Sequence, residues 1–222
     1  MQMLQVQSTP APAADGSPTR SVELAPGLSV LCTMMRFDRN EEIFAEEEDA
    51  DFVYKVMSGA VRDVRILSDG RRQIGSFHLA GEVFGLECAE AHRYSAEAVV
   101  DSEIAMVRRS TLERAVENNG PAARKLWGLT ARDLQRLQDH MLLLGRKSAV
   151  ERVASFLMGM AARNSAPQTV DLPMSRSDIA DYLGLTIETV SRTLSQLARD
   201  HAISMPSSRR IVLHERLAMA DA

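Results

Sequence analysis

The hydrophobic pattern of this chain changes once, from short runs broken by glycines to a helical repeat, and this change requires a two-part fold. Up to about residue 108 the apolar runs are short and end at glycines such as Gly59 and Gly70. Ser68-Asp69-Gly70 predicts a tight hairpin turn, because Asp-Gly tolerates positive φ. The runs predict strands at 52–58, 60–67, 72–78 and 104–108. Short strands at this spacing predict a β-sandwich, barrel or jelly roll.

A long helix is predicted next, from about residue 111 to 145. Apolar residues and one threonine recur there in steps of three and four: Trp127, Thr130, Leu134, Leu137, Met141 and Leu144. This spacing places them in one seam. Leu126, Leu129 and Leu143 lie off the seam and can pack on the β-domain. The seam either packs within its own domain or forms a coiled-coil dimer interface. A helix with two apolar sides favours the dimer.

The composition then sets the domain limits. Residues 1–25 are rich in Pro, Ala and small polar residues and predict a flexible tail. We expect a β jelly-roll domain at 26–110, the dimerisation helix at 111–145 and a C-terminal domain at 146–222. Gly145 provides a hinge, and Ser148 and Glu151 have the spacing of a capping box, which begins a helix.

Residues 175–199 predict two short helices joined by a tight turn. Ser175 and Asp178 resemble a second capping box, Gly184 permits a sharp turn, and Thr186 can cap a helix from Ile187 to about Arg199. Small or apolar residues occupy the positions where the two helices must pack: Ile179, Ala180, Leu183, Leu185, Val190 and Leu194. The pattern is either an ordinary helical hairpin or a helix-turn-helix.

The exposed face of the second helix favours the helix-turn-helix. Glu188 and Arg192 are four residues apart and so share one face. They either form an intrahelical ion pair worth about 0.2–0.5 kcal/mol or read bases. An arginine can donate two hydrogen bonds to guanine, and a carboxylate can accept one from cytosine. Recognition helices use their first turns in this way.

A wing is predicted after these helices. Residues 202–205 and 210–213 resemble two strands joined by the turn 206–209. Arg209 and Arg210 at its tip suit contacts with phosphates, which position a protein on DNA. The net charge is −4, but residues 146–222 carry slightly more basic than acidic side chains, which permits DNA binding by this part.

Several classes of protein are not predicted. The chain has no apolar run long enough for a membrane helix and no secretory signal, so we expect a cytoplasmic protein without a membrane partner. Cys32 and Cys88 lie in no metal-binding motif, so no metal or cofactor is expected. Motifs of nucleotide hydrolases, serine esterases and zinc proteases are missing, which argues against an enzyme.

The sequence resembles a known family at these positions. The run Ile187-Glu188-Thr189-Val190-Ser191-Arg192 resembles the E-x-x-S-R recognition motif of the FNR-like branch of the CRP/FNR superfamily. Residues 31–37, 54–62 and 84–87 resemble the FixK subgroup of alphaproteobacteria. The resemblance implies an α+β fold: a jelly roll like cyclic-nucleotide-binding domains, a dimerisation helix and a winged helix-turn-helix.

The resemblance also implies partners and site residues. It implies a homodimer on double-stranded palindromic DNA of the type TTGAT-N4-ATCAA, contact with RNA polymerase, and activation of microaerobic, respiratory and nitrogen-fixation genes. The implied base contacts are Ile187, Glu188, Ser191 and Arg192. The implied phosphate contacts are Arg176, Thr186 and Thr189.

Departures from the family pattern concern the residues that bind an effector or a sensing cofactor. The oxygen-sensing members need four cysteines, and this chain has two. Cyclic-AMP binders carry a cassette resembling G-E-x-x-G-E followed by R-[ST]-A. Here residues 81–87 are out of step with it, and Tyr94 separates Arg93 from Ser95. We therefore expect a regulator without an obligatory effector, with a ligand-gated regulator as the alternative. His78 is either a haem ligand or, as we expect, a packed core residue.

Overall fold

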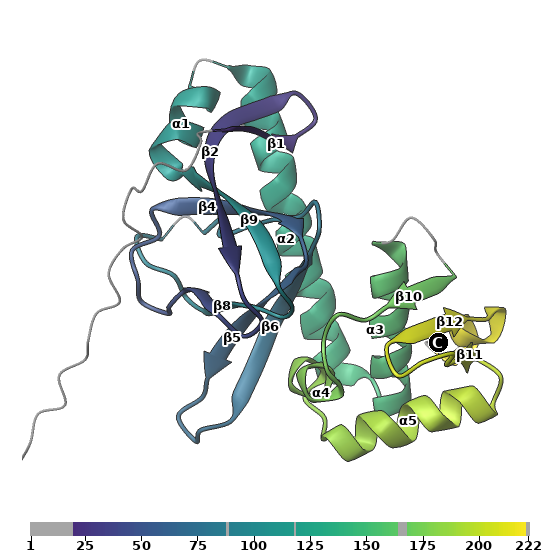
Figure 1. The fold of residues 1–222 in the computed structure, drawn as a ribbon. Coiled ribbons are helices and arrows are strands. Elements are labelled where there is room, and N and C mark those ends of the chain that lie inside the picture. The colour runs from purple at the N-terminus through teal and green to yellow at the C-terminus, as the bar shows by residue number, and fades with distance from the viewer. Residues whose placement is uncertain (1–19, 88, 118, 164–167, 221–222) are drawn as a thin grey trace, which may run out of the picture.

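The computed structural model describes residues 20–87, 89–117, 119–163 and 168–220. A β-domain lies along a long helix, and a C-terminal domain follows at the end of that helix, beside the β-hairpin of residues 60–79 (Figure 1). The strands of the β-domain are β1 (Arg20–Ala25), β2 (Leu28–Phe37), β3 (Glu42–Phe44), β4 (Phe52–Ser58), β5 (Ala60–Ile66), β6 (Arg72–Leu79), β7 (Val83–Phe84), β8 (Ser95–Ala98) and β9 (Ser102–Arg108).

These strands form two antiparallel sheets that curl into a roll. Their orders are β1-β2-β9-β4-β7 and β3-β8-β5-β6. Stacked rings occupy part of the interior: the centroids of Phe44 and His92 are 3.6 Å apart, and those of Tyr54 and Phe84 are 5.1 Å apart. The predicted jelly-roll fold is confirmed, and the four predicted strands differ from the observed ones by at most two residues at an end.

The predicted flexible tail at 1–25 is too long. Arg20–Ala25 forms strand β1, which pairs with β2. Val22 and Leu24 alternate with polar residues and are buried in the β-domain core, so the period of two that defines a half-buried strand outweighs the composition. Residues 1–19 lie outside the described part of the chain.

The predicted single helix at 111–145 is two helices, α1 (Arg109–Val116) and α2 (Gly120–Arg146). The Asn119 side chain accepts a hydrogen bond from the backbone N–H of Ala122 and caps α2, and Pro121 lies in its first turn. Proline has no N–H to donate, so it suits a helix start. Gly145 lies inside the last turn of α2, and the chain becomes extended only at Lys147.

The C-terminal domain is a winged helix-turn-helix, as predicted. Its elements are α3 (Ala149–Ala162), β10 (Thr169–Asp171), α4 (Arg176–Leu183), α5 (Ile187–Arg199), β11 (Ile203–Ser204), β12 (Arg210–Leu213) and the 3-10 helix η1 (Glu215–Ala220). Both predicted capping boxes form, at Ser148 with Glu151 and at Ser175 with Asp178. The wing strands join β10 in the order β10-β12-β11.

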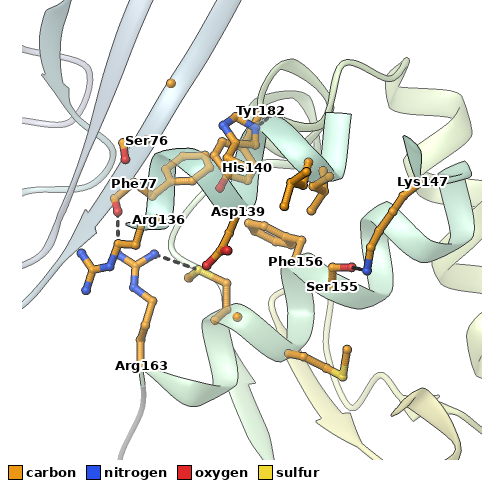
Figure 2. A pocket seen from close by; sticks show the side chains of 16 residues that line it. Ser76, Phe77, Arg136, Asp139, His140, Lys147, Ser155, Phe156, Arg163 and Tyr182 are labelled. Carbon is orange, nitrogen blue, oxygen red and sulfur yellow. Dashed lines mark hydrogen bonds between the residues drawn. The ribbon is translucent and has the colours of Figure 1, made fainter. Parts of the chain in front are cut away.

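The two domains share a hydrophobic core. Ile74 and Phe77 of β6 belong to the same buried cluster as Leu157 of α3 and Leu183 of α4. Figure 2 shows the cavity beside this junction, where Phe77, Phe156 and Tyr182 face one another; its volume is about 540 Å³. Burial of apolar area is the main favourable term in folding. The chain therefore breaks between α2 and α3 at Lys147, but the two domains still pack around one common core. Within the described part of the chain, no helix is both long and apolar enough to cross a membrane.

Candidate nucleic-acid interface

Helices α4 and α5 meet at a sharp turn. Gly184 has φ +61°, a conformation that side chains disfavour, and the N–H of Leu185 donates to the carbonyl of Ala180. The Thr186 side chain then caps α5 by accepting from the N–H of Thr189 at 3.2 Å. Val190 and Leu194 are buried. One face of α5 is therefore fixed to the domain, and the opposite face is left to solvent.

The exposed face of α5 carries the predicted pair Glu188 and Arg192. Both side chains are exposed, and neither has a hydrogen bond or ion pair with any residue that the structure describes. The intrahelical ion pair considered from the sequence is not formed. Ile187 is beside them and is 44% exposed. An acid, a guanidinium and an apolar side chain thus stand free on the first turns of this helix.

The other residues implied to contact DNA lie nearby but are engaged within the protein. Arg176 donates from Nη1 to the Ser191 hydroxyl at 3.3 Å, which joins α4 to α5. The hydroxyls of Thr186 and Thr189 are 3.0 Å apart and share a hydrogen bond. These contacts hold Ser191 and Thr189 at the edge of the exposed face.

The two arginines of the wing differ from each other. The Arg210 guanidinium donates to both carboxylate oxygens of Asp171 on β10, at 2.7 and 2.9 Å. The Arg209 side chain is exposed and has no ion pair among the described residues. Arg209 is therefore available to a phosphate, whereas Arg210 already has a partner.

The predicted seam of α2 is largely open. Trp127 is 76% exposed, and Leu134, Leu137 and Met141 are also exposed. Leu144 differs, because it is half-buried against the core that the two domains share. Off the seam, Leu126 and Leu129 pack on the β-domain as predicted, while Leu143 belongs to the core that the two domains share. The open part of the seam is an apolar stripe of the kind that marks interaction sites.

Sequence reasoning missed a charged cluster where the β-domain meets α4. Arg62 of β5 and Arg72 of β6 both donate to the carboxylate of Asp178. A signal was present: Arg62 alternates with Ala60 and Val64 on one face of this strand, and all three are buried. A charged residue there requires a buried partner.

The remaining predicted positions concern effectors. His78 is buried, contacts Asp63 at 2.8 Å and stacks on Phe84, as expected for a core residue. Cys32 is buried as a free thiol, and burial raises its pKa. Cys88 lies outside the described residues. Among the described residues, no group of His, Cys, Asp and Glu side chains is arranged to hold a metal ion.

Two family models match the chain. Residues 34–119 match the cyclic nucleotide-binding domain, and residues 151–222 match the Crp-like helix-turn-helix domain. The second match contains most of α3 and all of α4, α5 and the wing, and so includes the exposed face of α5.

Relatives and a solved structure resemble nearly the whole chain. The nitrogen fixation regulation protein FixK of Azorhizobium caulinodans is 48% identical over 197 residues, covering 86% of this chain and 79% of that protein. FixK of Rhizobium meliloti is 45% identical over 171 residues and covers 77% of each chain. The structure of FixK2 from Bradyrhizobium japonicum is 52% identical with a TM-score of 0.82, covering 86% of this chain and 98% of that chain.

Proposed function

Because the chain belongs to the CRP/FNR family of transcription regulators, we propose that it binds a palindromic DNA site as a homodimer and activates transcription there. The target genes would be those of microaerobic respiration and nitrogen fixation, since similar chains are nitrogen fixation regulators. The site would resemble TTGAT-N4-ATCAA, and the protein would act in the cytoplasm and contact RNA polymerase.

The unpartnered pair Glu188 and Arg192 carries this proposal. Both side chains are exposed on the first turns of α5, where a recognition helix meets base edges. A guanidinium can donate to the O6 and N7 atoms of guanine while a carboxylate accepts from the N4 amino group of cytosine. We infer that Arg192 and Glu188 together read one G·C pair, with Ser191 and Ile187 at the flanks.

The open seam of α2 supports the dimer. Trp127, Leu134, Leu137 and Met141 are exposed apolar side chains in one helical stripe, and two such stripes related by a twofold axis can pack as a coiled coil. The two recognition helices should then lie about 34–36 Å apart, one turn of DNA.

We further propose that DNA binding needs no small-molecule effector. Arg93, the nearest equivalent of the phosphate-binding arginine, is exposed. Stacked rings of Phe44, Tyr54, Phe84 and His92 occupy part of the roll's interior. The alternative is a regulator gated by a cyclic nucleotide, which the match to that domain family favours.

Selection of bound duplexes from a random oligonucleotide pool, with the full chain, tests the proposal. We expect a palindrome with half-sites one helical turn apart, and a mass of two chains per duplex by sedimentation. Affinity should be the same with and without cyclic AMP or cyclic GMP. Selection of an asymmetric site, or of no site, would reject the proposal, and affinity gained with a nucleotide would favour the ligand-gated alternative.

A further inference from the structure

One buried carboxylate joins the helix-turn-helix to the β-domain. Oδ2 of Asp178 accepts from the backbone N–H of Ser175 at 3.0 Å and from its hydroxyl at 2.7 Å, which completes the capping box at the start of α4. Oδ1 of the same carboxylate accepts from Arg62 at 3.0 Å and from Arg72 at 2.7 Å. Asp178 therefore stabilises the first turn of α4 and also bonds this helix to two strands of the β-domain.

The two arginines are themselves held in the β-domain. Arg62 is 5% exposed, and it also donates to Glu97 of β8 at 2.6 Å and to Asn40 at 3.1 Å. Arg72 extends the contact along α4, where it donates to the carboxylate of Asp181 at 2.8 Å. These bonds come from donors and acceptors on separate elements, so they define an orientation and not merely an attraction.

Further contacts around α4 and α3 also hold the C-terminal domain in this orientation. Gln73 donates to the carbonyl of Asp181 at 2.9 Å. Nε2 of His140, on α2, donates to the backbone carbonyl of Tyr182 at 2.8 Å, and the centroids of the two stacked rings are 3.9 Å apart. Figure 2 shows Arg163 at the end of α3 reaching Phe77, to whose carbonyl it donates.

Ion pairs of this kind are better suited to fixing a geometry than to adding stability. Removing two charges from water costs several kcal/mol per ion, and the attraction repays this only when the geometry is good. Bidentate and shared hydrogen bonds to arginine are directional. The cluster of Arg62, Arg72 and Asp178 thus disfavours other orientations of α4, because any rotation leaves buried charges without partners.

We propose that this cluster positions the recognition helix for DNA, with Asp178 as the positioning residue. The inference rests on the proposed DNA-binding function. Helix α5 follows α4 rigidly, because the Gly184 turn and the bond from Arg176 to Ser191 connect them. Figure 1 places the β5–β6 hairpin beside α4, and α5 extends away from it.

In the orientation that the cluster holds, the proposed recognition residues face solvent. Glu188 and Arg192 are exposed in it, while the carboxylates of Asp178 and Asp181 point to the β-domain. A regulator that needs no effector must keep its recognition helices in place at all times, and this cluster provides such a fixed arrangement.

The test compares two neighbouring arginines in the full chain. Arg72→Gln removes donors from Asp178 and Asp181, whereas Arg71→Gln removes the same charge from an exposed turn where Arg71 pairs with Asp69. Each protein is titrated with the selected palindrome and with a duplex that carries a single half-site. Circular dichroism confirms that both variants are folded at the assay temperature, and the double variant Arg62→Met/Arg72→Gln removes both arginines that bond to Asp178.

The ratio of the two affinities separates positioning from mere loss of structure. Apparent affinity falls with the fraction of molecules in the competent state. If that fraction falls about threefold per protomer, half-site binding weakens about threefold and palindrome binding about tenfold. Unfolding of whole dimers would lower both affinities equally, because it removes the same fraction of active protein in both titrations. We expect the unequal loss for Arg72→Gln, a larger one for the double variant, and less than a twofold change for Arg71→Gln.

Three results would overturn the inference. They are equal losses on both duplexes, unchanged affinity in the double variant, and a loss in Arg71→Gln as large as that in Arg72→Gln. A wild-type chain that binds no palindrome would instead reject the proposed function, so the two failures are distinguishable.

Discussion

The two helices of the helix-turn-helix treat their charges in opposite ways. On α4, Asp178 and Asp181 bond to arginines of the β-domain, and Asp178 is 4% exposed. On α5, Glu188 and Arg192 are exposed and have no partner among the described residues. The helices are similar in sequence, since each begins with a hydroxyl cap and carries an acid in its first turn. Their surroundings therefore decide what the charges do.

The comparison gives a criterion for distinguishing structural from functional charges in this fold. A buried charge with several partners is expected to stabilise one arrangement, and its loss should lower the free energy of unfolding. A free charge on a helix held by its opposite face adds little to stability. It is available to a partner outside the chain, which here would be a base pair.

The largest expected effect is on stability, at Asp178. Asp178→Ala leaves Arg62 buried with one partner fewer and removes the side-chain half of the capping box of α4, so we expect the free energy of unfolding to fall by about 3–5 kcal/mol. Glu188→Ala should stay within about 0.5 kcal/mol of the wild type. Urea unfolding followed by circular dichroism measures both. A loss at Asp178 no larger than at Glu188 would remove the distinction between the two helices.

The converse effect is on DNA affinity, at Arg192. Arg192→Ala should weaken binding to the selected palindrome by about 1–3 kcal/mol per half-site and relax selectivity at one G·C pair in each half-site, while unfolding is unchanged. Fluorescence anisotropy with the palindrome and with a G·C-substituted duplex measures this. An equal loss on the selected and a scrambled duplex would show that Arg192 contacts phosphates and not bases.

The sequence predicted α5 and its exposed face well, because amphipathic periodicity and capping are local signals. Ser175, Gly184 and Thr186 act as their residue types indicate. The contact between α4 and the β-domain was missed for the opposite reason: Arg62 and Asp178 are 116 positions apart. Asp178 was interpreted as a capping residue, which is correct but accounts for only one of its oxygens.

The other differences between prediction and structure have both local and long-range causes. The prediction of one helix at 111–145 is wrong because Asn119 and Pro121 are local signals for the start of a second helix. The predicted tail at 1–25 is too long because composition does not reveal that residues 20–25 pair with β2. Of the seam, Leu144 packs on the core that the two domains share, a contact that periodicity within one helix does not reveal.

A smaller effect is expected from acid, again at Asp178. Burial opposes its ionisation, but the hydrogen bonds from Ser175 and the charges of Arg62 and Arg72 outweigh burial, so the pKa of Asp178 is lower than its ordinary value of 3.8. The stability from this group is therefore complete above pH 3.8 and is lost as pH falls through the folded-state pKa. Urea unfolding between neutral and acid pH should show the wild-type and Asp178→Asn curves converging at low pH. Parallel curves would contradict this assignment.

The smallest expected effect concerns the wing, where the same comparison applies to adjacent residues. Arg209 has no partner among the described residues, whereas Arg210 bonds to Asp171. Arg209→Gln should reduce the slope of log affinity against log salt by about two phosphate contacts, one from each protomer of the proposed dimer, equally on all sequences. The neutral double variant Arg210→Gln/Asp171→Asn should keep the wild-type slope, because the pair carries no net charge. If the double variant lost as much slope as Arg209→Gln, Arg210 would have to leave Asp171 for a phosphate, and partnering in the free protein would not mark a charge as structural on this exposed strand.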